Sequence, residues 1–357
     1  MKNLTLLFLI PALGLAACSS DDDAASSGPK TDAQFQADVT QGMHDAMLGD
    51  IDDLHQAALD IAAAAPDHAW DADADATAIT NMKDAWIRAR TAYERTEGAL
   101  APLFPQIDVE IDARYDDFLA ELGDAGDQDL FDDQGVTGMH AIERILYAHE
   151  TPQSVIDFES DPVNFPGYKA AAWPATDDEA VEFKTKLCQR LGDDTQTLKN
   201  VWAPSAIDLD GAFGGLISLM NEQREKVNKA ATEEEESRYS QRTMQDIRDN
   251  LGGTKAIYAL FQPWLATKDN GKSIDGDVEN AFGELESAYG QVSGPAIPQP
   301  PADWSSEEPP ADALKTPFGE LWSAVQKAVD PNVQGSAVDG MNHAADALGF
   351  SEFSAGQ

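Results

Sequence analysis

The sequence predicts an all-helical protein. Apolar residues recur at helical spacing through most of the 357 residues, while almost no stretch alternates with the period of two that a strand shows. Segments rich in proline, glycine and aspartate separate the helical stretches and give each helix an end. The clearest helical patterns are Ile51, Leu54, Ala58 and Ile61; Met82, Trp86, Ala89 and Tyr93; Met139, Ile142 and Leu146; and Ile247, Leu251, Ile257 and Leu260.

The first residues have the pattern of a secretion signal. A short positive start precedes an apolar stretch at residues 4–15, which is far shorter than the roughly 20 residues that a membrane helix needs. The run LAAC at residues 15–18 resembles the lipobox of bacterial lipoproteins. We therefore expect residues 1–17 to be a lipoprotein signal peptide and Cys18 to carry the lipid anchor, with an ordinary cleaved signal as the alternative. No aspartate directly follows Cys18, which by resemblance to lipoprotein sorting favours the outer membrane.

Composition adds a tether and excludes one class of partner. Residues 18–32 are small, polar and partly acidic, so they should form a flexible tether behind the lipidated cysteine. The formal net charge of −40 disfavours nucleic acid and raises the local cation concentration. Cys188 would be the only thiol left, so no intrachain disulfide is expected, and its apolar neighbours at helical spacing predict a buried side chain.

The rest of the chain is long enough for two compact units. We expect a first helical bundle at residues 33–150 and a second at residues 176–357. The proline-containing segment at residues 151–175 should connect them. A second proline-rich stretch, residues 294–310, should be an ordered surface loop of the second bundle.

Two pairs of side chains in the first bundle have the spacing of metal ligands. His140 and Glu143 lie three residues apart in a predicted helix, so both project from one face, beside an apolar stripe. Glu94 and Glu97 have the same spacing on an upstream helix. Helical bundles build metal sites from such Glu/His pairs on facing helices, and buried carboxylates need a cation or a proton to neutralise them.

The spacing alone leaves a structural alternative open. The pattern recurs at His68 with Asp71 and at His343 with Asp346 in this acidic chain. Arg90 lies four residues before Glu94, so ordinary helical ion pairs could also account for the acids.

Three ordered stretches then resemble one known family. The run GMHAIERILY resembles the GxHxxE signature of the imelysin family, which includes the EfeO-type periplasmic iron-uptake lipoproteins. WIRARTAYERTEG with IDVEIDAR, and EEESRYSQRTMQDIRDNLGG, are similar to two further segments of that family. The resemblance implies an imelysin-like pair of helical bundles with a metal-site cleft, a location in the cell envelope, and metal binding, usually of iron.

The resemblance also implies roles for single residues. It assigns His140, Glu143, Glu94 and Glu97 to the metal site and adds one oxygen ligand, Asp112. Asp108 is the alternative in the same segment, and Arg114 matches an arginine that could orient a carboxylate beside the metal. The roles of Tyr239 and Asn250, which match the third segment, stay open.

These observations favour a lipid-anchored protein of the cell envelope that binds metal and assists iron uptake. It would be periplasmic and held at the outer membrane, with a metal permease or a redox protein as its partner. Iron is the expected ion, and zinc, manganese, copper(II) or calcium are the alternatives. One alternative function is a metallopeptidase of imelysin type, although the sequence has no HExxH motif. The other is a structural or interaction lipoprotein with a vestigial site.

Overall fold

Helices make up all the regular secondary structure that the structure describes, which confirms the predicted fold class. The computed structural model describes residues 28–113, 129–165 and 168–353. The predicted signal peptide, Cys18 and Arg114 lie outside these ranges. The helices are α1 (Asp32–Ala64), α2 (Ala76–Glu94), α3 (Glu97–Leu103), α4 (Pro105–Asp112), α6 (Gly138–Leu146), α7 (Gln153–Ser160), α8 (Asp177–Glu182), a π-helical turn (Phe183–Cys188), α9 (Gln189–Val201), α10 (Leu209–Lys229), α11 (Thr243–Leu265), α12 (Gly271–Gly290), α13 (Pro317–Val329) and α14 (Ala337–Leu348).

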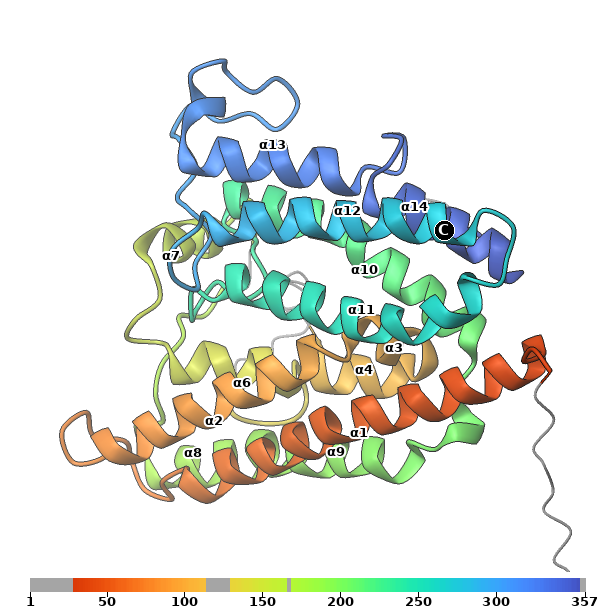
Figure 1. Cartoon of the computed structure of the whole chain (residues 1–357). Coiled ribbons are helices and arrows are strands. Elements are labelled where there is room, and N and C mark those ends of the chain that lie inside the picture. Colours follow the sequence, from red (N-terminus) through yellow and green to blue (C-terminus); the bar gives the residue numbers. More distant parts are fainter. Residues whose placement is uncertain (1–27, 114–128, 166–167, 354–357) are drawn as a thin grey trace, which may run out of the picture. The chain divides into compact units, whose positions relative to one another are not determined.

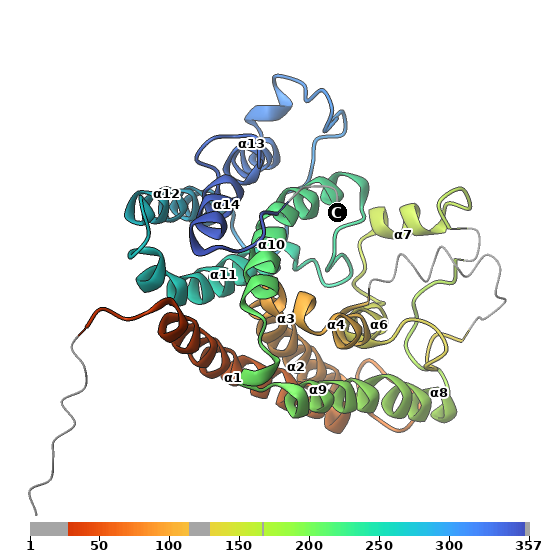
Figure 2. The ribbon, with the colours of Figure 1, turned by 90° about the vertical axis from the view of Figure 1, so that its right-hand side faces the viewer.

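One group of helices forms around α1, the longest of them. The predicted apolar stripe of α1 is buried in full, because Ile51, Leu54, Ala58 and Ile61 have no exposed surface. Helices α2 and α9 pack along α1 (Figure 2). The shorter α6 packs on α2 and α9, and α4 packs on α6 and α9. Cys188 lies buried in this group as a free thiol, as its apolar neighbours predict.

A second group consists of the later helices. Helix α14 packs on α10, α12 and α13, and α13 also packs on α10 and α12 (Figure 1). Helix α11 packs on α10, α12 and α14. Large aromatic side chains fill the contact between α10, α11 and the end of α14, where Phe213 lies 4.9 Å from Phe261 and 5.6 Å from Phe350 between ring centroids. These side chains belong to the apolar core that runs through both groups of helices.

Several contacts join the two groups. Helix α11 packs on α1, α2 and α3, and α10 packs on α3. Helix α9, which the sequence assigns to the beginning of the second bundle, packs against α1 and α4 of the first group. Residues 32–357 accordingly form one compact unit.

The proline-rich stretch at residues 294–310 is irregular and lies against the second group. Trp304 packs on Phe318 and Trp322 of α13, with ring centroids 4.7 and 5.3 Å apart. The Arg248 guanidinium of α11 donates to the carbonyl oxygen of Gly294 at 2.7 Å. These contacts hold the loop at its first residue and at Trp304.

None of the helices in the described ranges is both long enough and apolar enough to span a bilayer.

Candidate metal centre

The predicted motif lies in the protein interior. Every residue of α6, from Gly138 to Leu146, is buried, and His140 keeps only 2% of its surface exposed. His140 Nδ1 lies 2.9 Å from Glu143 Oε2, across one turn of the helix. Glu143 Oε1 accepts a hydrogen bond of 2.8 Å from the backbone N–H of Ser240. Both oxygens of Glu143 are therefore engaged, one with the imidazole and one with a segment about a hundred residues away.

Gly138 explains how Asp112 reaches His140. Its φ is +81°, and a Cβ at this position would lie 2.3 Å from the carbonyl oxygen of Ile111. Only glycine combines that backbone conformation with so close an approach. Because α6 thus begins against the last turn of α4, Asp112 Oδ1 lies 3.4 Å from His140 Nε2.

A third side chain, Glu236, completes a possible metal-binding group. Ligand atoms of Asp112, His140 and Glu236 all lie within 4.8 Å of one another. Glu236 stands in the irregular segment between α10 and α11, in which Glu233 and Gln241 have φ of 62° and 55°. The sequence reasoning missed this residue. The stretch EEESRYS marked the segment, but four consecutive acidic residues in so acidic a chain did not show which one turns inward.

The pair Glu94 and Glu97 lies beside this group, at a break between two helices. Helix α2 ends at Glu94 and α3 begins at Glu97, whereas the sequence suggested one continuous helix. The amide of Asn250 takes the place of the missing helical hydrogen bonds, because its Nδ2 donates to the carbonyl oxygen of Glu94 at 3.0 Å. The same Nδ2 lies 2.5 Å from Glu94 Oε2 and 2.8 Å from Glu97 Oε2, so its two N–H groups are shared among three acceptor oxygens.

Gly253 allows Asn250 to reach the break. A Cβ at Gly253 would lie 2.0 Å from the carbonyl oxygen of Arg95, so α11 touches the end of α2 directly. Asn250 and Gly253 stand one helical turn apart on α11 and meet the same turn of chain. The role of Asn250, which the sequence left open, is thus to hold the backbone and both carboxylates of this break.

Arg90 connects the acidic pair with the histidine group. Its guanidinium is fully buried and forms ion pairs with Glu94, Asp112, Glu236 and Asp246. The expected ion pair between Arg90 and Glu94 therefore exists. It coexists with the candidate metal group instead of replacing it, because Asp112 and Glu236 belong to both.

Lys226 of α10 is the second buried cation. It is 1% exposed, and its Nζ lies 2.7 Å from Glu236 Oε2 and 3.3 Å from Glu97 Oε2. The five predicted ligands consequently fall into two sets. Glu143 and Asp112 lie beside the imidazole of His140, while Glu94 and Glu97 lie beside the ammonium of Lys226.

The burial of so many acids raises their affinity for protons. Desolvation raises the pKa of Glu94 well above its usual value, against the opposing charges of Arg90 and Lys226. Desolvation likewise raises the pKa of Asp246 to about 6. For His140 desolvation lowers the pKa, but the negative charge of Asp112 outweighs it, and the pKa rises to about 9. With a pKa of about 9, the His140 imidazole keeps its second proton at neutral pH, and a bound cation would displace that proton.

Asp108 lies apart from the histidine group. Its Oδ1 accepts a hydrogen bond of 2.6 Å from the hydroxyl of Tyr93, and burial raises its pKa to about 7. Of the two acids that the resemblance offered, the structure brings Asp112 to His140.

Tyr239, whose role the sequence also left open, belongs to a neighbouring buried cluster around Glu159 of α7. Its hydroxyl donates to Glu159 Oε1 at 2.5 Å, and Arg238 Nε donates to the same oxygen at 3.0 Å. Arg144 of α6 lies 3.3 Å from Glu159 Oε2. This cluster fixes the segment that carries Glu236 and the backbone of Ser240 against α6.

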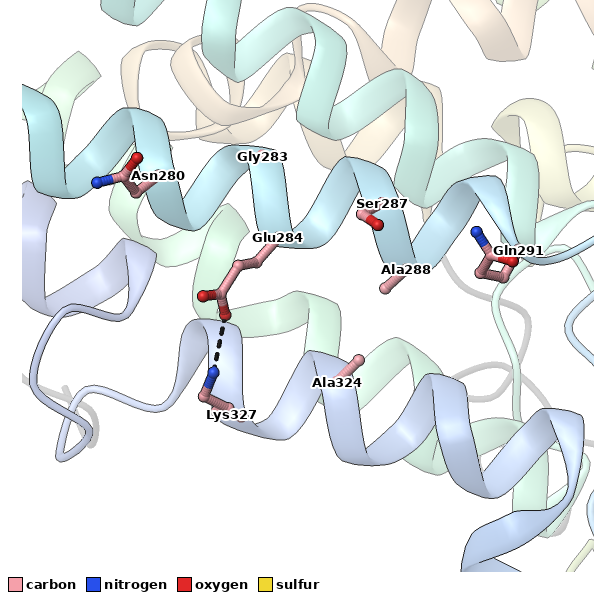
Figure 3. A pocket seen from close by; sticks show the side chains of 8 residues that line it. All are labelled: Asn280, Gly283, Glu284, Ser287, Ala288, Gln291, Ala324 and Lys327. Carbon is pink, nitrogen blue, oxygen red and sulfur yellow. Dashed lines mark hydrogen bonds and ion pairs between the residues drawn. The ribbon is translucent and has the colours of Figure 1, made fainter.

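One hollow of the surface lies elsewhere and offers less chemistry than the buried group. A groove of about 700 Å³ between α12 and α13 is lined by small and amide side chains (Figure 3). Its charged residues, Glu284 and Lys327, form an ion pair with each other at 3.0 Å. The buried group around His140 is therefore the better candidate for a functional site.

Comparisons with known proteins identify the family and the fold. The family model described as Imelysin matches residues 41–315, and that segment contains every described residue of the candidate site. A solved structure of an imelysin-like protein from Psychrobacter arcticum 273-4 superposes with a TM-score of 0.55 at 12% identity, covering 90% of this chain and 98% of that one. That likeness supports the fold.

The relatives of known name are EfeM and EfeO proteins. The iron uptake system component EfeM of Pseudomonas syringae pv. syringae is 25% identical over 208 residues, which are 58% of this chain and 57% of that protein. An Efem/EfeO family lipoprotein of Staphylococcus haemolyticus is 25% identical, over 80% of this chain and 84% of its own. The iron uptake system component EfeO of Yersinia pseudotuberculosis is 27% identical, over 50% of this chain and 37% of its own. The chain thus spans about half of the first relative and most of the second.

Proposed function

Because this chain belongs to the imelysin family, we propose that it binds an iron ion at His140, Asp112 and Glu236 and assists iron uptake at the cell envelope. One observation carries the proposal. His140 Nε2 is buried and, within the described residues, makes no hydrogen bond, although it faces the carboxylates of Asp112 and Glu236. A buried nitrogen of this kind is costly unless a ligand satisfies it.

The three ligand side chains are chemically suited to an iron ion. One imidazole nitrogen and two carboxylate oxygens suit iron, manganese or zinc, and they do not suit an ion that prefers thiolates. Glu143 then has a supporting role. Because a carboxylate can only accept, His140 Nδ1 must carry the proton of this contact, and Nε2 is the nitrogen that faces the metal. We therefore assign Glu143 to the orientation of His140 and the other three residues to the ion.

The neighbouring residues would complete the charge balance. Arg90 contacts both Asp112 and Glu236, so it would hold these two carboxylates in position before the ion arrives. Glu94 and Glu97, which the sequence assigned to the ion, would stay with Lys226 and Asn250.

The proposal locates the protein on the periplasmic side of the outer membrane, anchored through a lipidated Cys18. The signal-like beginning of the sequence supports this location, and so does the relative that is named as a lipoprotein. The relatives named as iron uptake system components support a permease or redox protein as the partner that receives the ion.

Metal titration of matched histidine variants tests the proposal. Purified protein is titrated with Fe²⁺ without oxygen, and with Zn²⁺ and Mn²⁺, and the bound metal is measured by calorimetry and elemental analysis. We expect one ion per chain, and at least a roughly 100-fold loss of affinity in His140→Ala. His343→Ala is the control, because His343 repeats the motif spacing toward Asp346 on the exposed side of α14. Wild-type protein that binds none of the three ions would contradict the proposal and favour a structural role.

A further inference from the structure

The ammonium of Lys226 occupies a cage of four oxygens. Its Nζ lies 2.7 Å from Glu236 Oε2, 3.1 Å from Asn250 Oδ1, 3.3 Å from Glu97 Oε2 and 3.6 Å from Glu94 Oε2. Three of these oxygens belong to carboxylates, and the side chain of Lys226 is 1% exposed. This is the surrounding that proteins give to a hard divalent cation, at distances suited to an ammonium instead of a metal.

The cage shares one residue with the candidate iron site. Glu236 turns Oε2 toward Lys226, and the same side chain belongs to the group with Asp112 and His140. A carboxylate that serves two neighbouring cations is the arrangement of a two-metal centre in a helical bundle. Here one of the two cation positions holds a lysine side chain.

Asn250 fixes the cage from the other side. Its Nδ2 donates to both Glu94 and Glu97, so its Oδ1 is turned toward Lys226.

We propose that Lys226 takes the place of a second metal ion and thereby limits the site to one ion per chain. This inference rests on the proposed function, because it assumes an ion at His140. Glu94 and Glu97 have the residue types and spacing of metal ligands, which is why the sequence suggests them as such. They do not take up metal in the wild-type protein, because a tethered cation of the chain already neutralises them.

A site that holds a single ion can release that ion more easily. An iron ion that leaves the His140 group leaves behind a cage that is still neutralised by Lys226 and Arg90. A second metal ion bridged through Glu236 would hold the first more firmly. A protein that must pass its ion to a partner gains from the absence of that bridge.

Replacement of Lys226 by a neutral side chain of similar length tests this inference. Lys226→Met and the charge-preserving control Lys226→Arg are titrated with Mn²⁺, which suits an oxygen-rich cage. We expect the number of bound Mn²⁺ ions per chain to rise from one to two in Lys226→Met and to stay at one in Lys226→Arg. Bound metal is counted after desalting.

Stability measurements keep the test informative if Lys226→Met folds poorly. Without metal this variant should melt at a lower temperature, because three buried carboxylates have lost their cation. Mn²⁺ should restore its melting temperature and raise it by more than in wild type. A variant that still binds one ion, or that Mn²⁺ does not stabilise, overturns the inference alone. Wild-type protein without any bound ion would instead overturn the proposed function.

Discussion

Gly138 and Ile111 touch through their backbones, and this contact brings two distant parts of the sequence into one site. A Cβ at Gly138 would lie 2.3 Å from the Ile111 carbonyl oxygen and 2.7 Å from its carbonyl carbon. Asp112 follows Ile111 directly, and His140 stands two residues after Gly138. The glycine of the GxHxxE motif therefore has a physical purpose, because it lets the beginning of α6 lie against the end of α4.

Gly138→Ala should damage both stability and metal binding. The new methyl group meets rigid backbone atoms at a φ of +81°, so we expect the free energy of unfolding to fall by about 2 to 4 kcal/mol. Metal affinity should fall by about 10-fold or more, since Asp112 must move away from His140. Gly283→Ala on α12 is the control, because a Cβ there meets nothing within 4 Å and should be neutral or stabilising. Urea unfolding and metal titration measure the two effects, and equal behaviour of the two variants would contradict the argument.

Glu236→Gln should weaken metal binding where Glu235→Gln does not. The two neighbours are buried to a similar degree, but only Glu236 belongs to the group with His140 and Asp112. We expect a loss of affinity of roughly 10- to 100-fold for Glu236→Gln. Burial raises the pKa of Glu235 to about 7, so its replacement by glutamine should slightly stabilise the protein above that pH. Titration of both variants with Fe²⁺ decides, and similar affinities would exclude Glu236 as a ligand.

Asn250→Asp should destabilise the protein strongly although the two side chains have nearly the same shape. The amide donates to the Glu94 carbonyl oxygen and to the carboxylates of Glu94 and Glu97, and an aspartate can only accept. The carbonyl oxygen and the two carboxylates would then face a third carboxylate instead of a donor, at a cost of about 3 to 5 kcal/mol. Asn280→Asp on the exposed side of α12 should change the stability by less than about 0.5 kcal/mol. Thermal melts of both proteins provide the comparison.

Glu159→Gln should loosen the segment that carries Glu236. Glu159 is the shared acceptor of Arg238 and Tyr239, and it pairs with Arg144, so its neutralisation leaves buried cations without their counter-charge. We expect a loss of about 2 to 4 kcal/mol in stability and a roughly 10-fold loss of metal affinity, although Glu159 does not face the ion. The exposed pair of Glu150 with Lys83 offers the matched control, and Glu150→Gln should cost at most about 1 kcal/mol. Unchanged metal affinity in Glu159→Gln would show that the cluster does not support the site.

The metal-free protein should lose stability as the pH rises from about 5 to about 9. Burial raises the pKa of Asp246 to about 6 and that of Asp108 to about 7, and the charge of Asp112 outweighs burial to raise that of His140 to about 9. The folded state therefore binds these protons more tightly than the unfolded state, so its advantage is complete at low pH and is lost as each group deprotonates. His55, whose pKa is lowered by burial, opposes this trend.

Urea unfolding in the presence of a chelator measures this dependence. The midpoint should be higher at about pH 5.5 than at about pH 8.5, by at least about 2 kcal/mol in the free energy of unfolding. Saturating Fe²⁺ should reverse the order, because the ion replaces the lost protons. A flat or rising profile without metal would show that the buried cations alone neutralise these acids.

Much of the fold could be predicted from local pattern. The apolar stripe of α1 is buried as its spacing indicates, and the family resemblance that rests on three short segments is confirmed. The local pattern was less informative where contacts between distant residues determine where a helix ends. It suggested a single helix through Glu94 and Glu97, but Asn250, about 150 residues later, ends α2 between them by bonding the Glu94 carbonyl oxygen.

The candidate site shows the same division. His140, Glu143 and Asp112 could be named from the sequence because they stand in recognisable motifs. Glu236 could not, because its orientation depends on the irregular segment at residues 233–242 and on the anchor that Glu159 provides from α7. Lys226 has no motif at all, and its role follows only from the four oxygens that surround its ammonium.

Apolar periodicity and short motifs are local properties of the chain, and they were enough to predict the helical class, the family and the residue types that can hold a metal ion. Which acids face His140 and which face Lys226 depends instead on how the chain is folded. A carboxylate that is buried away from water must be neutralised by a cation or a proton. The acids therefore divide between His140 and Lys226 according to which of the two lies next to them in the fold. Contacts between residues that are more than a hundred positions apart settle this division, as between Glu97 and Lys226.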